Sequence, residues 1–363
     1  MLAHPLAPED YATEESFHRE RTAMFANEWH FAGLASEMPH SGDYISVAPF
    51  EMPLVCRNAS GELRAFQNVC AHRHCAVVGL GSGSSATMRC QYHGWEYNDE
   101  GRIAKITDGV SFKGLKAKEL GLERYRLETL GDLVFVNFNA GAPSLRESIG
   151  DLSEELDHFF GNHRLLWRWV NEYPVNWKII VENAVESYHV PMLHPGTFMD
   201  YKNEEHHDHR LHPTYTSYLD VAPMGRGITD VAFGTLTRWS APSNRFDRAK
   251  HIHIFPHHMF EVREIYSLFS TVEPLGPKRT RLTSLGFLPR GIRMPVVNRP
   301  IQWMFGIALT TMARRIMGED IGIWDEVQRG VANSRHTGLL SRREERVHAF
   351  QRYVADRVSS STG

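Results

Sequence analysis

The chain has 363 residues, which is enough for two domains of ordinary size. Its formal net charge of −3 gives no basic surface of the kind that nucleic acid requires, so we expect no nucleic-acid partner. The N-terminus lacks a basic segment followed by an apolar run, and no stretch of about 18 uncharged apolar residues occurs. We therefore expect a cytoplasmic protein that does not bind a membrane.

The first part of the chain is predicted to be one helix followed by short strands. Aromatic residues recur among charged ones at roughly helical spacing over residues 15–29, which predicts an amphipathic helix. Beyond it, β-branched and aromatic runs alternate with Gly, Asn and Asp, and the clearest predicted strands are 44–47, 53–56, 63–68 and 133–138. We expect residues 31–142 to form a small antiparallel β domain, with residues 1–30 as a helical segment that packs on the second domain.

Helical spacing of apolar residues returns after residue 142. It covers residues 145–159 and then 177–185, and we expect Pro191 to stop the second helix. Residues 215–289 are predicted to form an antiparallel sheet with strands at 252–255, 260–269 and 281–287. The C-terminal part is predicted to be helical over 301–317, 320–332 and 344–358. Residues 143–363 are therefore expected to be an α+β domain, in which helices cover a sheet around an apolar interior.

Two short motifs offer thiolate and imidazole ligands. Cys70 and His72 lie in a CxHR motif, and Cys90, His93 and Trp95 lie in a CxxHGW motif. A tetrahedral zinc ion uses the same ligand types. However, zinc fingers usually present both cysteines before both histidines, whereas here each motif has one of each. This order suits a [2Fe-2S] cluster in which one iron binds both thiolates and the other binds both imidazoles.

A second set of ligand types follows. Glu186 and His189 are three residues apart, which predicts that they share one face of a helix, and His194 comes just after Pro191. Two histidines and one carboxylate form the facial triad that leaves positions on iron(II) open. By itself, this spacing is also explained by ordinary core or surface histidines.

The motifs CxHR, CxxHGW and NxxExYHxxxxHP, in this order, resemble those of the terminal oxygenase (alpha) subunit of Rieske non-haem iron oxygenases, of the ring-hydroxylating and quaternary-ammonium types. The resemblance extends over essentially the whole chain. It implies a Rieske [2Fe-2S] domain over residues 31–142 and a catalytic domain with mononuclear Fe(II) over residues 143–363. It also implies O2 as co-substrate and Trp95 as a shield for the cluster, although the spacing of Trp95 equally fits a core residue. Asn183 is expected either near the iron or packed within its helix.

In this family the third iron ligand is an acidic residue of a C-terminal helix. The segment 317–330 resembles that acid-rich stretch, and Asp320 is the expected ligand, with Glu319 and then Asp325 as alternatives. The simpler explanation is that Asp320 is an acidic residue that favours the positive start of its own helix.

The resemblance also implies an assembly and electron-transfer partners. Glu186 takes the position of a family carboxylate that hydrogen-bonds an iron-ligand histidine and a cluster histidine of the neighbouring subunit. It would connect His189 to His93 of an adjacent chain, which implies a homotrimer. Electrons would come from an NAD(P)H-dependent reductase, directly or through a ferredoxin.

The expected function is hydroxylation of an aromatic or otherwise hydrophobic small molecule. The alternative is monooxygenation or N-demethylation of a quaternary ammonium compound of the carnitine, betaine or choline type, because Glu in place of the more usual Asp at position 186 occurs in such relatives. A non-catalytic Rieske electron carrier is a remote third. Side chains predicted to line the substrate pocket are apolar or soft: Met192, Phe198, Met199, Phe233, Trp239, Met259 and Phe260.

The remaining candidate ligands have simpler explanations. Cys56 and Cys75 are expected to be free packing thiols, because a reducing compartment disfavours their pairing. Two groups of histidines lack a partner motif and are predicted to lie in solvated loops: His206, His207, His209 and His212, and His251, His253, His257 and His258.

Overall fold

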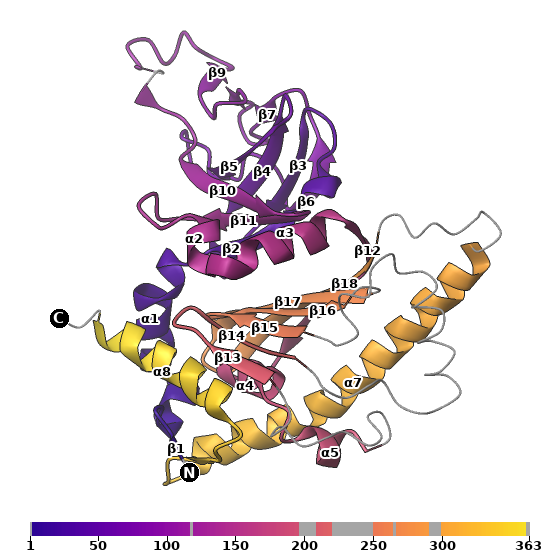
Figure 1. The fold of residues 1–363 in the computed structure, drawn as a ribbon. Coiled ribbons are helices and arrows are strands. Elements are labelled where there is room, and N and C mark those ends of the chain that lie inside the picture. The colour runs from indigo at the N-terminus through magenta and orange to yellow at the C-terminus, as the bar shows by residue number, and fades with distance from the viewer. Residues whose placement is uncertain are drawn as a thin grey trace. The chain divides into compact units, whose positions relative to one another are not determined.

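The chain folds into two units, each built on an antiparallel sheet (Figure 1). The computed structural model describes residues 2–116, 119–195, 208–219, 250–263, 266–289 and 299–360. One unit is Ala26–Gly161, and the other combines Met1–Phe25 with Asn162–Gly363. The expected α+β class, with a β unit ahead of a helix-covered sheet, is confirmed.

The first unit contains a seven-stranded sheet and a three-stranded sheet. The larger has the order β2 (His30–Leu34), β11 (Leu133–Asn137), β10 (Arg124–Leu130), β5 (Glu62–Gln67), β4 (Leu54–Ala59), β3 (Asp43–Val47) and β6 (Gly81–Ser84). The smaller consists of β7 (Met88–Arg89), β8 (Glu96–Tyr97) and β9 (Ile103–Lys105). Val55 and Phe66 of the larger sheet pack in one core with Met88 and Tyr97 of the smaller. The motif cysteines Cys70 and Cys90 belong to the same core, so this core supports both motif loops.

The first unit extends beyond the boundary expected at residue 142. Helices α2 (Leu145–Ile149) and α3 (Ser153–Gly161) belong to it. The turn between β10 and β11 contacts α3, since Gly131 N donates to Asp157 Oδ1 at 2.8 Å and Asp132 N donates to Phe160 O at 3.2 Å. The change from strand to helical spacing marked a new type of element correctly, but periodicity does not say on which sheet a helix packs.

The second unit is a seven-stranded antiparallel sheet with helices against it. Its order is β12 (His163–Tyr173), β18 (Arg279–Pro289), β17 (Tyr266–Gly276), β16 (His258–Arg263), β15 (Lys250–Ile254), β14 (Tyr215–Leu219) and β13 (Asp208–Leu211). Strands β12 and β13 were not predicted. Residues 260–269 were predicted as one strand, whereas residues 260–263 belong to β16 and residues 266–269 to its paired neighbour β17.

Helix α4 (Trp177–Val185) packs on β15 and β17 and contacts both α7 (Arg299–Asn333) and α8 (Glu345–Ser360) (Figure 1). The predicted helices 301–317 and 320–332 form one continuous helix, α7. Gly318 between them does not end it, because an interior glycine costs a helix only about 1 kcal/mol. In the described part of the chain, no helix has an apolar stretch long enough to cross a membrane, even though α7 has 35 residues.

Buried charges attach the N-terminal helix α1 (Glu14–Ala23) to α4. The Lys178 ammonium contacts Glu20 Oε1, and Trp177 Nε1 donates to Glu20 Oε2 at 2.7 Å. The side chain of Lys178 is fully buried and that of Glu20 is 4% exposed. Removing one member of such a pair typically costs about 3–5 kcal/mol, because it leaves a buried charge without compensation. This contact therefore fixes the start of α4.

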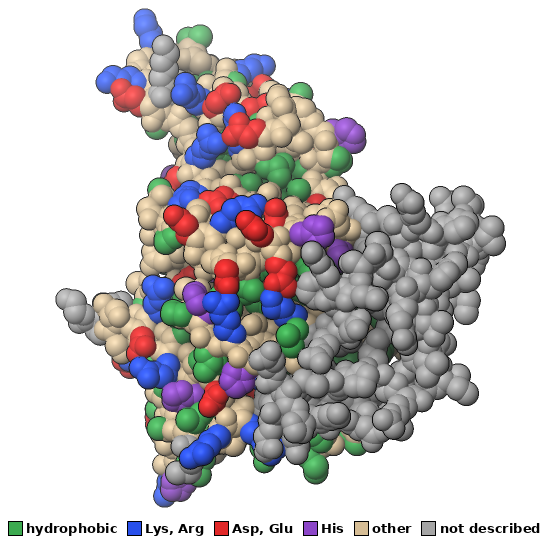
Figure 2. All heavy atoms as spheres, viewed as in Figure 1, with side chains coloured by type: hydrophobic (Ala, Val, Ile, Leu, Met, Phe, Trp, Pro, Cys, Tyr) green, Lys and Arg blue, Asp and Glu red, His purple; other side chains and the backbone are tan. Residues whose placement is uncertain are grey.

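Surface charges contribute less. On the face drawn in Figure 2, acidic and basic side chains are interspersed over the described residues. One surface group consists of Glu172, which pairs with Arg279 at 2.6 Å and Arg281 at 3.0 Å, and Glu273, which pairs with Arg281 at 3.0 Å. Exposed pairs of this kind each stabilise a fold by ~0–1 kcal/mol. The buried cores therefore contribute most of the stability.

The contact between α3 and the β10–β11 turn gives a test of the unit boundary. Gly131 has φ +58°, and a Cβ at this position would lie 2.2 Å from Gly161 N. We expect Gly131→Ala to lower the free energy of unfolding of the first unit by about 3 kcal/mol, since it adds backbone strain and forces α3 away. Urea unfolding followed by near-UV circular dichroism measures the loss.

Gly61→Ala is the matched control, because Gly61 has φ +98° and nothing within 4 Å of an added Cβ. It should cost only the conformational strain, about 1 kcal/mol. Equal losses in the two variants would contradict the proposed packing of α3 on the turn.

Candidate functional site

The two motif loops of the first unit have the same backbone hydrogen bonds. Cys70 N donates to Cys75 O at 2.9 Å, and Cys90 N donates to Trp95 O at 2.8 Å. His74 N donates to Cys70 O at 3.0 Å, just as Gly94 N donates to Cys90 O at 2.9 Å. Each loop is thus closed at its first and sixth residue, and each projects one cysteine and one histidine.

These loops bring the four predicted cluster ligands together. Cys70 and Cys90 are buried, and the rings of His72 and His93 are half-buried with their centroids 4.6 Å apart. His72 Nδ1 is buried without a hydrogen-bond partner. Burial, together with the nearby His93 and Arg73, lowers the pKa of His72, which favours the neutral imidazole that binds metals. A buried ring nitrogen without a partner, in loops that also carry two buried thiols, fits a cluster held by two cysteines and two histidines.

Trp95 is buried and lies against one histidine. Its ring stacks on His72 with centroids 5.0 Å apart and planes 7° from parallel, and Phe112 packs edge-on against both. This position agrees with the expected shielding of the cluster from water.

Tyr97 is a contact that the sequence analysis missed. Its hydroxyl accepts a hydrogen bond from Ala71 N at 2.9 Å and lies 3.2 Å from Cys70 Sγ. Because the oxygen accepts from the amide, its own hydrogen is available for the sulfur. Burial and the hydrogen bond to Cys70 raise the pKa of Tyr97 well above its usual value, so the hydroxyl stays protonated. A tyrosine shortly after a CxxHGW motif was the only available signal.

The second site surrounds the short helix α5 (Val190–Leu193). His189 precedes this helix and His194 follows it. Contrary to the prediction, α4 ends at Val185 and Glu186 is extended, so Glu186 and His189 do not share a helix face. Pro191 lies in the first turn of α5, where a missing N–H costs nothing, and it therefore begins a helix and does not stop one.

The three expected iron ligands converge. His194 Nε2 lies 3.2 Å and His189 Nε2 lies 3.7 Å from Asp320 Oδ1, and the three ligand atoms are all within 4.8 Å of one another. Burial lowers the pKa of His194, but hydrogen bonds with Asp320 and Glu319 outweigh it and the net shift is upward. The carboxylates thus favour positive charge at this point, as a divalent cation would require.

Carboxylates hold the opposite nitrogens of both rings. Glu186 Oε1 accepts from His189 Nδ1, and Glu319 Oε2 accepts from His194 Nδ1 at 2.6 Å. Each bond places the ring proton on Nδ1, because a neutral imidazole carries one proton, so Nε2 keeps the lone pair that a metal ion would bind. Two Nε2 atoms and one carboxylate oxygen that face a shared space fit a 2-His-1-carboxylate metal site.

This geometry separates the three acidic candidates. Asp320 faces both Nε2 atoms, whereas Glu319 contacts the far side of His194 and pairs with Arg315 at 3.3 Å. Asp325 is exposed. Asp320 lies in the middle of α7, so the explanation that it favours the start of its own helix is wrong.

Asn183 contacts the same carboxylate. It lies on α4, and its Nδ2 donates to Asp320 Oδ1 at 3.1 Å. Its Oδ1 accepts from Trp324 Nε1 at 3.0 Å. Of the two expected positions, the structure therefore places Asn183 beside the predicted iron ligands.

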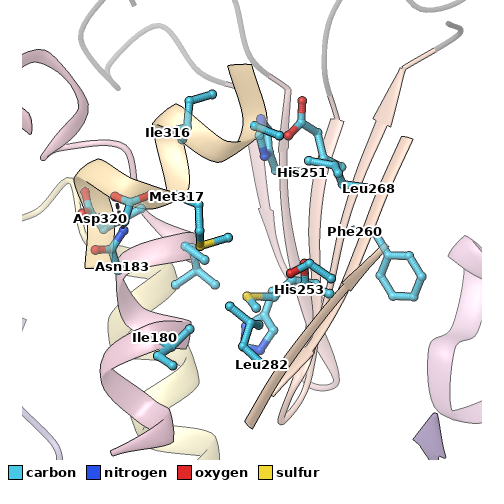
Figure 3. Close-up of a pocket in the computed structure, with 18 of the residues that line it drawn as sticks. Ile180, Asn183, His251, His253, Phe260, Leu268, Leu282, Ile316, Met317 and Asp320 are labelled. Carbon is cyan, nitrogen blue, oxygen red and sulfur yellow. Dashed lines mark hydrogen bonds between the residues drawn. The ribbon is translucent and has the colours of Figure 1, made fainter. Parts of the chain in front are cut away.

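A cavity of about 280 Å³ opens beside these residues (Figure 3). Its floor consists of two rows of side chains that cross the sheet from strand to strand, since residues opposite one another share a face. The first row is Tyr218, His251, Glu261, Leu268, Gly286 and Trp167, and the second is Thr216, His253, Met259, Ser270, Ser284 and Trp169. Helices α4 and α7 contribute Ile180, Ile316 and Met317 to the opposite wall (Figure 3).

Gly286 shapes this floor. A Cβ on Gly286 would lie 2.4 Å from the indole of Trp167, its neighbour across β12 and β18. The absence of a side chain thus allows the Trp167 ring to lie over the sheet, stacked on Trp169 with centroids 3.8 Å apart.

The predicted pocket residues are only partly confirmed. Met259 and Phe260 line the cavity, whereas Met192 does not and is 85% exposed. Phe198, Met199, Phe233 and Trp239 lie outside the described residues.

The interpretation of the histidine groups as solvated loops is wrong for the second group, whereas in the first group His212 lies in a turn and His209 is exposed on a strand. His209 lies in β13 and pairs with Glu345 at 3.0 Å, while His251 lines the cavity. The other members of the second group are buried: His253, His257 and His258. Burial lowers the pKa of His253 to about 3, and its Nε2 donates to Pro256 O at 2.9 Å. A run of polar residues does not reveal that a strand buries one of its faces.

His212 lies at the β13–β14 turn and stacks on Tyr215, whereas His206 and His207 are outside the described residues.

Comparison with known proteins places this geometry in a family. The description "Ring hydroxylating alpha subunit (catalytic domain)" matches residues 160–360, and "Rieske [2Fe-2S] domain" matches residues 28–116. The chain belongs to the ring-hydroxylating alpha subunit family and carries an N-terminal Rieske domain.

The names of the matched relatives state different substrates. Biphenyl 2,3-dioxygenase subunit alpha of Rhodococcus jostii (strain RHA1) is 30% identical over 201 residues, which are 53% of this chain and 42% of that protein. The carnitine monooxygenase oxygenase subunit of Acinetobacter baumannii is 27% identical over 63% of this chain and 64% of its own. The chain thus matches less than two thirds of either relative. Choline monooxygenase of Spinacia oleracea is 28% identical over 89% of this chain and 71% of its own.

Solved structures show the same fold. The quaternary ammonium Rieske monooxygenase CntA matches with a TM-score of 0.81 at 23% identity, covering 97% of this chain and 94% of its own. Naphthalene 1,2-dioxygenase matches with a TM-score of 0.82 at 19% identity, covering 99% and 94%. At these identities the likeness concerns the fold, and it does not choose between the two substrate classes.

The roles of Asp320 and Glu319 can be separated by metal analysis. We expect about three irons and two acid-labile sulfides per parent chain, and Asp320→Ala should lose about one iron because it removes a ligand. Glu319→Ala should keep the site and bind the mononuclear iron about 10- to 100-fold more weakly, as is typical when a partner of a ligand histidine is removed. Iron retained by Asp320→Ala but lost outright by Glu319→Ala would reverse the assignment.

Tyr97→Phe should lower the reduction potential of the cluster. Loss of a hydrogen bond to Cys70 Sγ removes ~1 kcal/mol of stabilisation from the more negative, reduced form, which corresponds to roughly 40 mV for one electron. A redox titration, monitored by the electron paramagnetic resonance (EPR) signal of the reduced cluster, measures this reduction potential. Tyr92→Phe is the control, since Tyr92 is 54% exposed and its hydroxyl accepts from Arg73. Equal potentials in both variants would contradict a role for Tyr97.

Proposed function

We propose that this chain is the terminal oxygenase component of a Rieske oxygenase system, which uses O2 and electrons from a partner to oxidise a small molecule. The observation that carries the proposal is the group His189, His194 and Asp320, whose ligand atoms converge beside a mostly apolar cavity. A Rieske electron carrier has no need of a second ligand set or of a cavity. The matched catalytic domain supports the same conclusion.

The residues divide into two binding sites. Cys70 and Cys90 would hold one iron of a [2Fe-2S] cluster, and His72 and His93 the other. His189, His194 and Asp320 would hold mononuclear Fe(II) and leave one side of the metal open to the cavity. When bound, the cluster supplies electrons one at a time and the Fe(II) supplies oxygen activation.

The protein contributes orientation and exclusion of water. Glu186 and Glu319 hold the two imidazoles by Nδ1, so both Nε2 atoms stay directed at one point. Asn183 holds Asp320 from the α4 side. The apolar wall formed by side chains such as Ile316 and Leu282 keeps water from the substrate and positions one of its carbons near the ligand group.

We infer that the substrate is an aromatic or otherwise hydrophobic small molecule. Trp167 and Trp169 present a flat apolar surface to the cavity, and Ile180, Leu282 and Leu309 add aliphatic contacts. A planar ring would pack on the indoles with little loss of side-chain entropy, because the stacked pair is already ordered. The biphenyl dioxygenase relative supports this class.

A quaternary ammonium substrate is the second candidate, and one row of the cavity floor favours it. Glu261 lies in the same row as Tyr218 and Trp167. The Glu261 carboxylate would attract an alkylated cation through charge, and Trp167 would add a cation–π contact worth about 0.5–2 kcal/mol. The Tyr218 ring is already covered, by the guanidinium of Arg346 at 4.0 Å and by the His251 ring at 4.5 Å. The carnitine and choline monooxygenase relatives support this alternative.

We further propose that the active form is a homotrimer in the cytoplasm, supplied by an NAD(P)H-dependent reductase directly or through a ferredoxin. Glu186 would connect His189 to His93 of the adjacent subunit. His93 is half-buried, and the Glu186 side chain is 11% exposed. The Glu186 oxygens already accept from His189 Nδ1 and from the backbone N–H groups of Tyr188 and His189, so a bond to His93 would use a remaining lone pair. The reductase and the trimer follow from the family resemblance.

A single-turnover experiment tests the function without a partner reductase. The anaerobic holoprotein, with its cluster chemically reduced, is mixed with O2 and one compound of a panel: biphenyl, terephthalate, carnitine, choline or glycine betaine. We expect substrate-dependent oxidation of the cluster and one oxygenated product, with biphenyl or terephthalate for the aromatic class. No oxidation with any compound, together with only two irons per chain, would leave an electron carrier.

Glu186→Gln in the same assay tests the path between subunits. We expect iron content near that of the parent but at least tenfold slower oxidation of the cluster, because the amide cannot accept hydrogen bonds from two imidazoles as a carboxylate does. Asp325→Asn, a change at an exposed carboxylate of α7, should behave as the parent. Normal oxidation in Glu186→Gln would contradict the path and leave the oxygenase function intact.

A further inference from the structure

Trp324 lies one helical turn beyond Asp320 on α7 and is 3% exposed. Its ring packs edge-on against Tyr173 of β12, with centroids 5.2 Å apart and planes at 84°. Its Nε1 donates to Asn183 Oδ1 at 3.0 Å, and Asn183 Nδ2 donates to Asp320 Oδ1 at 3.1 Å. A short chain of hydrogen bonds therefore leads from a buried indole to the carboxylate of the metal site.

The direction of this chain is determined by chemistry. An indole N–H only donates and an ionised carboxylate only accepts, so the amide between them has one possible orientation. Trp324 requires the oxygen of Asn183 on its side, and the amide nitrogen must then face Asp320. Without the indole N–H, the amide oxygen would lose its hydrogen-bond partner, and Asp320 alone would no longer keep the amide in one position.

The hydrogen bond from Asn183 ends on the oxygen of Asp320 that faces both histidines. Asp320 Oδ1 is the atom that lies 3.2 Å from His194 Nε2 and 3.7 Å from His189 Nε2. A donor held against this atom fixes the rotation of the carboxylate relative to both imidazoles. Since Trp324 and Asp320 lie on the same helix and Asn183 lies on α4, the chain also fixes the spacing of α4 and α7 at the site.

We propose that Trp324 is a positioning residue for the mononuclear metal site, and that it acts through the amide of Asn183. The proposal rests on the proposed function, because it assumes that His189, His194 and Asp320 bind a metal. Trp324 anchors the amide oxygen of Asn183, and the amide nitrogen in turn holds the carboxylate of Asp320.

Co(II) binding to the holoprotein tests this inference apart from activity. The mononuclear metal is removed with a chelator, the cluster is kept oxidised and therefore silent in EPR, and Co(II) is added by equilibrium dialysis. We expect Trp324→Phe to raise the Co(II) dissociation constant about threefold to tenfold and to alter the Co(II) EPR spectrum. Asn183→Ala should weaken binding about 10- to 100-fold, as expected for loss of a direct partner of a ligand.

The double variant decides whether Trp324 acts through Asn183. If it does, Trp324→Phe has no further effect on the dissociation constant in the Asn183→Ala background, because the amide it orients is gone. Multiplying effects in the double variant, or parental binding by Trp324→Phe, would overturn the inference. Trp177→Phe is the matched control: it removes another buried indole N–H, from the bond to Glu20, and should lower the melting temperature without changing Co(II) affinity.

A second substitution covers the case in which Trp324→Phe does not fold. Trp324→Met also lacks a donor but adapts to irregular space, so it must weaken Co(II) binding as well. Parental affinity in Trp324→Met would equally overturn the inference. Failure of the parent itself to bind one Co(II) per chain would instead contradict the proposed function.

Discussion

The metal site depends on two carboxylate–imidazole hydrogen bonds. Glu186 and Glu319 each hold the Nδ1 of one histidine, so both Nε2 atoms face Asp320. His189 and His194 flank a helix of only four residues, which by itself could not keep two rings in register. The bond from Glu319 connects this short helix to α7, the helix that also carries Asp320. The same contact therefore orients a ligand and joins two segments that are far apart in the sequence.

The other elements of the second unit support this arrangement. The buried Lys178–Glu20 pair holds the start of α4, and Asn183 near the other end of α4 reaches Asp320. The sheet provides a floor whose two rows of side chains follow from antiparallel register, and Gly286 leaves room for the Trp167 ring. Helices thus position the ligand group, while strand residues together with side chains of α4 and α7 line the cavity beside it.

The two units solve the problem of binding a metal in different ways. In the first, two loops with the same backbone hydrogen bonds each present one cysteine and one histidine. The local backbone geometry of each loop therefore positions its own pair of candidate ligands. In the second, the candidate ligands come from the two ends of a short helix and from the middle of a distant one. Local loops are predictable from a short motif, whereas an assembly of distant helices is not.

The sequence by itself determined the cluster motif, the order of the two domains and the choice of His189, His194 and Asp320 as candidate ligands. Ligand type and spacing within a few residues can be recognised in the sequence alone, because they do not depend on contacts between distant parts of the chain. Only the tertiary structure showed that Glu319 contacts the far side of His194, that Glu186 leaves the helix, and that His253 is buried in the cavity floor. It also joined Tyr97 to Cys70, and Trp324 through Asn183 to Asp320. These contacts depend on which face of a strand or helix meets its neighbour, and packing between residues far apart in the chain decides that.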